Sequence, residues 1–99
     1  MNQTCKDAVD IFGKREQTMV AIEAMGKLIQ TINQFAHNRA ISRDLYEAIA
    51  DVTISCVQLS YIVESDIEGD YKVRAIIDEK LNRIEKNITI KKLSVACQK

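Results

Sequence analysis

The feature that most limits what this chain can fold into is the scarcity of residues that interrupt regular structure. Its 99 residues include no proline and only 3 glycines. A sheet protein needs many tight turns, and glycine and proline form most of them. Aromatic residues, which are frequent in strands, make up only 5 % of the chain. We therefore expect an all-α protein of about one domain's length.

The charges and cysteines argue against several classes of protein. The 14 basic and 14 acidic residues give a formal net charge of zero, whereas nucleic-acid-binding proteins usually carry a basic excess. No run approaches the roughly 18 apolar residues that span a membrane, and MNQTCKDAVD is no signal peptide. The widely spaced Cys5, Cys56 and Cys97 fit neither a disulfide framework nor a zinc site. We expect a cytoplasmic protein with reduced thiols that binds neither nucleic acid nor membrane.

Residue spacing predicts three to four helices with short connections, which is a helical bundle. The first helix is short, opens with a capping box of Thr4 and Asp7, and ends near Gly13. The second covers residues 14–35 and contains Gly26, which we expect to permit close packing against a neighbouring helix. Its apolar face consists of Met19, Ile22, Met25, Ile29, Ile32 and Phe35.

The third predicted helix, residues 43–63 with Ser42 as N-cap and Asp44 in its first turn, is apolar on two sides. One side is a heptad-like seam of Leu45, Ile49, Val52, Cys56, Leu59 and Val63. The other consists of Ile54, Val57 and Tyr61. Such a helix needs more partners than a chain of this size easily supplies. We therefore expect a homo-oligomer, with Cys56 in a core.

The remaining sequence predicts one more helix after an acidic connection. In that connection, Ser65 and Glu68 fit a capping box. The last helix is expected over about residues 71–87, and residues 91–99 form a tail or extend it. A single helical domain would thus cover residues 1–90.

Carboxylates on otherwise apolar helices mark the candidate site. Glu23 lies on the second helix, and Glu47 and Asp51 lie four residues apart on the third, hence on one face. Ser55 and Gln58 continue that polar strip. From spacing alone the strip is either a solvated helix face or part of a binding site.

Four segments, taken in order, resemble a known family. They are FGKREQ, IEAMGKLIQ, LYEAIADV and KLNR, which begin at residues 12, 22, 45 and 80. Their order and spacing over residues 8–87 resemble the MazG-like all-α nucleoside triphosphate pyrophosphohydrolases. This resemblance implies a helical bundle whose four-helix core is completed by dimerisation, either as a dimer or as a pair of dimers.

The resemblance also implies where metal and substrate would bind. The family's four Mg²⁺ ligands fall here on Ala24, Lys27, Ala48 and Asp51, of which only Asp51 is a carboxylate. Alanine offers no oxygen and an ammonium repels the cation, so the metal site required for hydrolysis is dismantled. Basic and polar residues matching the family's triphosphate contacts are Lys80, Arg83 and Asn87. Lys27 would attract a phosphate or pair with Asp51 or Glu47, while Gln17, His37 and Arg39 are candidates for a base pocket.

Three functions follow from these observations. The leading interpretation is a non-catalytic MazG-like protein that binds a nucleotide or a partner protein without a cofactor. The alternative is an active Mg²⁺-dependent pyrophosphohydrolase with a rearranged site formed by Glu23, Glu47 and Asp51. The third is a helical interaction protein that has no small-molecule ligand.

Overall fold

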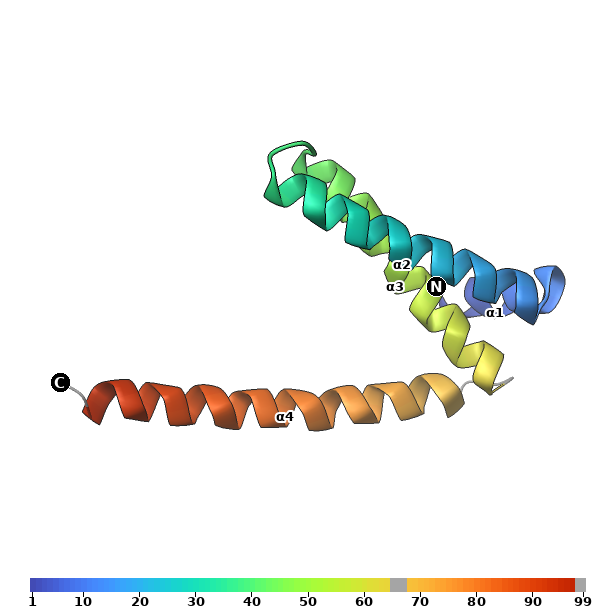
Figure 1. Cartoon of the computed structure of the whole chain (residues 1–99). Helices are drawn as coiled ribbons and strands as arrows, with labels where there is room; N and C mark the ends of the chain where they lie inside the picture. Colours follow the sequence, from blue (N-terminus) through green and yellow to red (C-terminus); the bar gives the residue numbers. More distant parts are fainter. Residues whose placement is uncertain (65–67, 98–99) are drawn as a thin grey trace. The chain divides into compact units, whose positions relative to one another are not determined.

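The computed structural model describes residues 1–64 and 68–97, and over these residues the chain is all-α. The described part contains four helices and no strand (Figure 1). The helices are α1 (Asn2–Phe12), α2 (Lys14–Ala36), α3 (Ser42–Val63) and α4 (Glu68–Cys97). The chain divides into two compact units, residues 1–69 and residues 70–99. The predicted fold class is confirmed.

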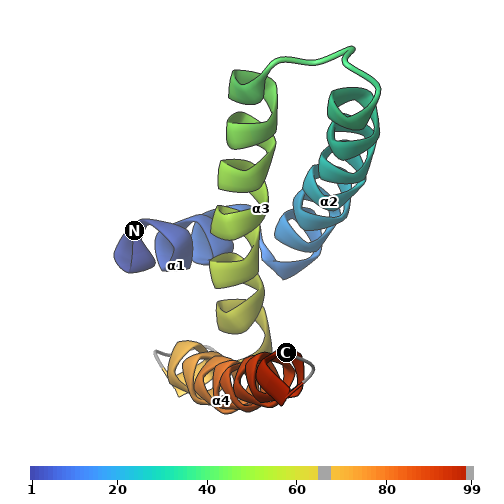
Figure 2. The same ribbon diagram turned by 90° about the vertical axis from the view of Figure 1, so that its left-hand side faces the viewer.

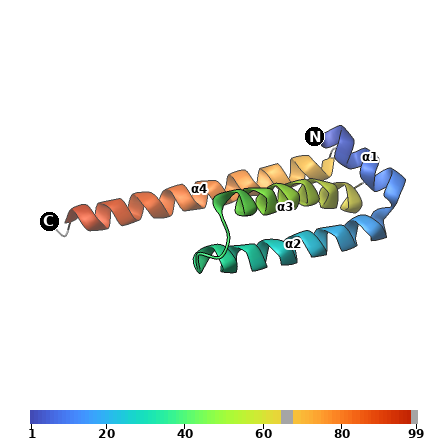
Figure 3. The ribbon, with the colours of Figure 1, turned by 90° about the horizontal axis from the view of Figure 1, so that it is seen from above.

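The first unit is an antiparallel helix pair crossed by a short helix. A turn joins α2 to α3, which run side by side (Figures 2 and 3), and α1 packs on α3 and more lightly on α2. Within the turn, Asn38 has a φ of 59°, a left-handed conformation that asparagine tolerates better than most residues. Because the connection is short, α2 and α3 are held as antiparallel neighbours.

Gly13 separates α1 from α2, as its position in the sequence predicts. Its φ of 93° and ψ of 152° belong to a region that is essentially restricted to glycine. Its N–H donates to the carbonyl of Val9 at 2.9 Å, which ends α1. At the other end, the predicted cap at Thr4 is wrong. The Met1 carbonyl accepts the N–H of Cys5 at 3.0 Å, so the helix begins at Asn2.

α3 begins at Ser42, one residue earlier than predicted. Ile41, not Ser42, is the N-cap residue. The Ile41 N–H donates to Asp44 Oδ2 at 3.0 Å, and the Asp44 N–H donates to the Ile41 carbonyl at 3.0 Å. Asp44, the acidic residue expected in the first turn, therefore provides the hydrogen-bond acceptor for a backbone N–H at the N-terminus of α3.

The contact between α2 and α3 is built from small and polar side chains. Ala21 is 2 % exposed and Ala48 1 % exposed, and Thr31 and Ser55 are also buried. The large apolar side chains predicted to face the core of α2 instead point largely outward, with Ile29 70 % exposed. The hydrophobic spacing therefore predicted the helix correctly but not its buried face, because small residues allow the two backbones to approach closely.

A separate apolar cluster joins α1 to α3. Cys5, Val9 and Tyr61 are buried together, with the partly buried Val57 and Ile62 against them. The prediction that Cys56 lies in a core is wrong, since its side chain is exposed and Cys5 is the buried cysteine. The reason is that α3 turns its Tyr61 side toward α1 and leaves part of the heptad-like seam uncovered.

The second unit is a single helix that is longer than predicted. α4 continues to Cys97, so residues 91–97 extend the helix, and no proline or glycine occurs after Gly69 to end it earlier. The predicted Ser65–Glu68 capping box depends on a residue outside the described part. No helix of the described residues is both long and apolar enough to cross a membrane.

Candidate functional site

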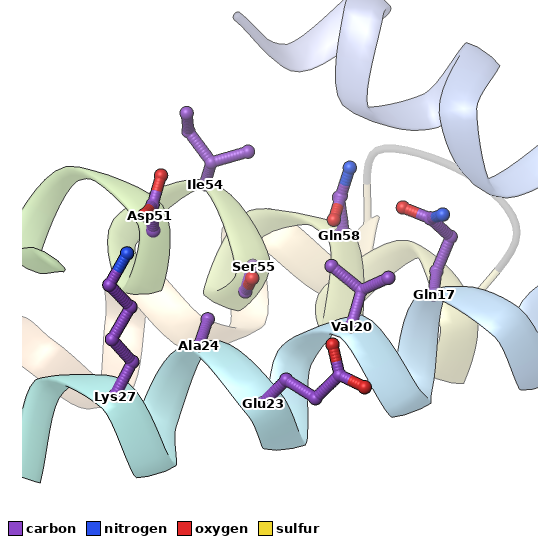
Figure 4. Close-up of a pocket in the computed structure, with 9 residues that line it drawn as sticks. All are labelled: Gln17, Val20, Glu23, Ala24, Lys27, Asp51, Ile54, Ser55 and Gln58. Carbon is purple, nitrogen blue, oxygen red and sulfur yellow. The ribbon is translucent and has the colours of Figure 1, made fainter. Parts of the chain in front are cut away.

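A pocket of about 330 Å³ opens between α2 and α3, within the first unit (Figure 4). Both helices contribute to its wall, which contains charged, amide and apolar side chains. Its lining residues are Gln17, Val20, Glu23, Ala24, Lys27, Asp51, Ile54, Ser55 and Gln58. Three of the four positions that the resemblance assigns to metal ligands, Ala24, Lys27 and Asp51, therefore lie in one pocket.

Three charged side chains line this pocket. Glu23 and Lys27 lie one turn apart on α2, and Asp51 lines the pocket from α3. In Figure 4 the Lys27 side chain extends from α2 toward α3 on the side of Asp51. The ion pairs among the described residues do not include one between Lys27 and Asp51. The ammonium and the carboxylate thus share the pocket while both remain available to a ligand.

Three polar side chains of buried residues also line the pocket. Ser55 is 3 % exposed, Gln17 7 % and Gln58 8 %. Over residues 1–64 and 68–97, none of the three has a hydrogen-bond partner for its side chain, and no fully enclosed polar atom is left unsatisfied. Their polar atoms therefore face the open space of the pocket. Ser55 and Gln58 were visible in the sequence only as a continuation of the polar strip from Asp51.

The structure does not bring the predicted carboxylate trio together. Glu47 lies outside the pocket lining, where its Oε1 pairs with Nε of Arg43 at 3.2 Å and both side chains are exposed. In the described ranges, no group of three or more His, Cys, Asp or Glu residues is placed to hold a metal ion. The pocket itself offers two carboxylates beside an ammonium, a donor set that does not fit Mg²⁺.

The remaining predicted contacts lie elsewhere. Lys80, Arg83 and Asn87 are exposed on one face of α4 in the second unit, and Arg83 donates to Glu79 at 2.8 Å. His37 has its Nδ1 2.7 Å from the carbonyl of Asn33. Of the residues proposed for a base pocket, only Gln17 lines the pocket between α2 and α3.

Comparisons with known proteins do not assign the chain to a family. No protein-family model, curated protein or solved structure matches the chain. The structure establishes an all-α protein with four helices in its described part.

Proposed function

We propose that this protein is a non-catalytic MazG-like protein that binds a nucleotide in the pocket between α2 and α3. The observation that carries the proposal is the set of buried residues, Gln17, Ser55 and Gln58, whose polar atoms face the pocket without a protein partner. Most buried polar side chains in folded proteins have hydrogen-bond partners. The polar atoms of these three side chains are open to solvent at one pocket, so they can bond to water or to a ligand whose donors and acceptors replace that water.

The chemistry of the lining favours a nucleotide among small ligands. A carboxamide presents an acceptor and a donor side by side, which is the arrangement that reads the edge of a base. Gln17 and Gln58 offer two carboxamides from opposite helices, and Lys27 offers an ammonium for a phosphate. The volume of about 330 Å³ is at the lower end of the range for small-molecule sites.

The same lining argues against hydrolysis. Breaking the bond between the α- and β-phosphates needs cations that neutralise developing charge and activate water. Lys27 and Ala24 occupy metal-ligand positions on α2, and Ala48 is 1 % exposed and carries no oxygen on its side chain. With one ammonium beside Glu23 and Asp51, the pocket suits a ligand with few negative charges better than a triphosphate.

The proposal is tested by measuring the melting temperature of the full chain with a panel of nucleosides, nucleotides and dinucleotides, each with and without Mg²⁺. Pyrophosphate release is assayed in the same samples. A ligand at 100 times its dissociation constant stabilises a protein by about 2.7 kcal/mol, or roughly 10 °C or more for a domain of this size. We expect stabilisation without Mg²⁺ and without pyrophosphate release.

Two acidic residues on α3 provide a matched pair of variants. Asp51 lines the pocket, whereas Glu47 lies one turn earlier, outside the lining, and is also exposed. We expect Asp51→Asn and Gln58→Leu to change the ligand-induced shift in melting temperature, and Glu47→Gln to leave it unchanged. Equal effects of Asp51→Asn and Glu47→Gln would place the ligand elsewhere.

The alternative enzyme has one observation in its favour, because Glu23 and Asp51 line the same pocket from opposite helices. It predicts Mg²⁺-dependent pyrophosphate release that Asp51→Ala abolishes while the helices stay folded. That result would overturn the non-catalytic proposal. If no nucleotide raises the melting temperature, the chain is better described as a helical protein that acts through protein partners.

A further inference from the structure

The pocket between α2 and α3 has two ends of different chemistry. Because the two helices are antiparallel, Gln17, the first lining residue of α2, lies at the same end as Gln58, the last lining residue of α3. Lys27 and Asp51 lie together at the other end, as Figure 4 shows. We call these the amide end and the charged end. A ligand that reaches both ends must carry two different recognition groups.

The separation of the two ends sets the length of that ligand. At about 1.5 Å of helix per residue, residues 17–27 of α2 extend over roughly 15 Å and residues 51–58 of α3 over roughly 10 Å. The apolar side chains of Val20 and Ile54 and the buried residue Ser55 line the pocket between the ends. A base joined through a sugar to a phosphate has its hydrogen-bonding edge and its charge at opposite ends, as this arrangement requires.

The charged end presents one positive and one negative group to the same ligand. Over the described residues, neither the Lys27 ammonium nor the Asp51 carboxylate takes part in an ion pair or a side-chain hydrogen bond. Glu23, one turn before Lys27 on α2, extends away from the lysine in Figure 4. Each group of the charged end can therefore bind a ligand group of opposite charge.

Asp51 discriminates among the phosphates that Lys27 could hold. A terminal phosphate monoester carries close to two negative charges at pH 7, as a phosphorylated side chain does. One ammonium balances only one of these charges, and the Asp51 carboxylate at the same end repels the other. A phosphate that bears a second substituent keeps a single negative charge, which Lys27 alone balances.

The carboxylate also determines which second substituent fits. An ionised carboxylate only accepts hydrogen bonds, so its partner must be a donor. An ammonium is a donor that also carries the complementary charge, and such charge-assisted hydrogen bonds are roughly twice as strong as neutral ones. The best match for Asp51 is therefore an amine placed just beyond the phosphate that Lys27 holds.

We propose that the ligand is a nucleoside monophosphate that carries an amine-bearing substituent on its phosphate, so that the molecule has no net charge. Lys27 binds the phosphate and Asp51 binds the ammonium at the charged end, while Gln17 and Gln58 bind the base at the amide end. This inference rests on the proposed nucleotide site and narrows its ligand to one class of nucleotide.

Matched esters test the inference by isothermal titration calorimetry of the full chain without Mg²⁺. For each common ribonucleoside, the 5′-(2-aminoethyl) phosphate is compared with the 5′-(2-hydroxyethyl) phosphate. Both esters have the same size and the same phosphate charge, but only the aminoethyl ester carries an ammonium. We expect the aminoethyl ester of at least one base to bind about tenfold more tightly than its hydroxyethyl counterpart.

Variants at the charged end assign the two roles. Asp51→Asn keeps the shape of the side chain and should make the two esters bind equally. Lys27→Met removes the phosphate contact and should weaken both esters by a similar factor. Glu47→Gln, at the exposed acid outside the pocket lining, should leave the preference for the aminoethyl ester unchanged. Melting curves followed by circular dichroism show whether each variant is folded.

The outcomes distinguish this inference from the proposed function. Equal binding of the two esters to the wild type would overturn the inference and leave the nucleotide site standing, as would a preference for the aminoethyl ester that survives in Asp51→Asn. If no ester binds while simple nucleotides raise the melting temperature, the inference alone is wrong. If neither esters nor simple nucleotides bind, both proposals are wrong.

Discussion

The thiol of Cys5 on α1 lies 3.9 Å from the backbone carbonyl oxygen of Ile54 on α3, to which it donates a weak hydrogen bond. The contact fixes α1 against the helix that forms one wall of the pocket, since Ile54 is also a lining residue. Cys5 is 3 % exposed, whereas Cys56 and Cys97 are exposed. The single buried thiol therefore reports on whether α1 stays docked.

Thiol labelling should separate the cysteines. In the folded protein we expect a thiol reagent to modify Cys56 and Cys97 rapidly and Cys5 only when α1 leaves α3. Mass spectrometry of the labelled chain after increasing times gives the two rates. Val9→Ala, which removes buried volume from the same cluster, should speed the labelling of Cys5, and rapid modification of all three cysteines in the wild type would contradict the structure.

The stability of the protein should decrease in alkali partly through Cys5. Burial raises the pKa of the Cys5 thiol, and the positive N-terminus lowers it by less. Above the ordinary thiol pKa of about 8.5, the unfolded chain loses this proton while the folded chain retains it, so the free energy of unfolding falls as pH rises. Denaturant unfolding from pH 7 to 10 should show a smaller fall for Cys5→Ala than for the wild type. Identical pH profiles would mean that the thiol titrates alike in both states.

The start of α3 should depend on Asp44 and not on Ser42. Asp44→Ala removes the carboxylate that accepts the Ile41 N–H and should lower the free energy of unfolding by about 1 kcal/mol. Ser42→Ala should change it little, because no hydrogen bond of the Ser42 hydroxyl occurs among the described residues. Urea unfolding of both variants measures the difference, and a larger loss from Ser42→Ala would restore the cap predicted from the sequence.

Two glycines should respond to alanine with opposite signs. Gly26→Ala should raise the free energy of unfolding by about 1 kcal/mol, because helix propensity improves and nothing lies within 4 Å of the new methyl group. Gly13→Ala should lower it by about 1–2 kcal/mol, because a φ of 93° is strained for alanine. Thermal and denaturant unfolding at low protein concentration compares them, and the same sign at both positions would contradict the backbone described here.

The sequence predicted the helices better than their faces. The end of α1 at Gly13 and the extents of α2 and α3 follow from glycine and apolar spacing, which are local properties. Which side of a helix is buried depends on the neighbour, and spacing does not identify the neighbour. Thus Ala21 and Ala48 are buried while Ile29 is not, because the pair packs through its small residues.

The candidate site was predicted in part. The positions of Lys27 and Asp51 in the resembling segments predicted that they would share a site, and they line one pocket. Helical spacing placed Glu47 on the same face as Asp51, yet Glu47 lies outside the lining and pairs with Arg43. Only the residues on one narrow side of each helix can line a pocket between two helices. The sequence alone does not show which side of each helix faces the pocket.

The small residues between α2 and α3 also limit how this protein can diversify. Ala21 and Ala48 are among the most tightly enclosed side chains of the first unit, and the pocket lies between the same two helices. A larger residue at Ala48, which does not line the pocket, would push the two helices apart and widen it. For the nucleotide proposed above, we therefore expect substitutions at these two alanines to change the size of the ligand that fits, without contacting that ligand.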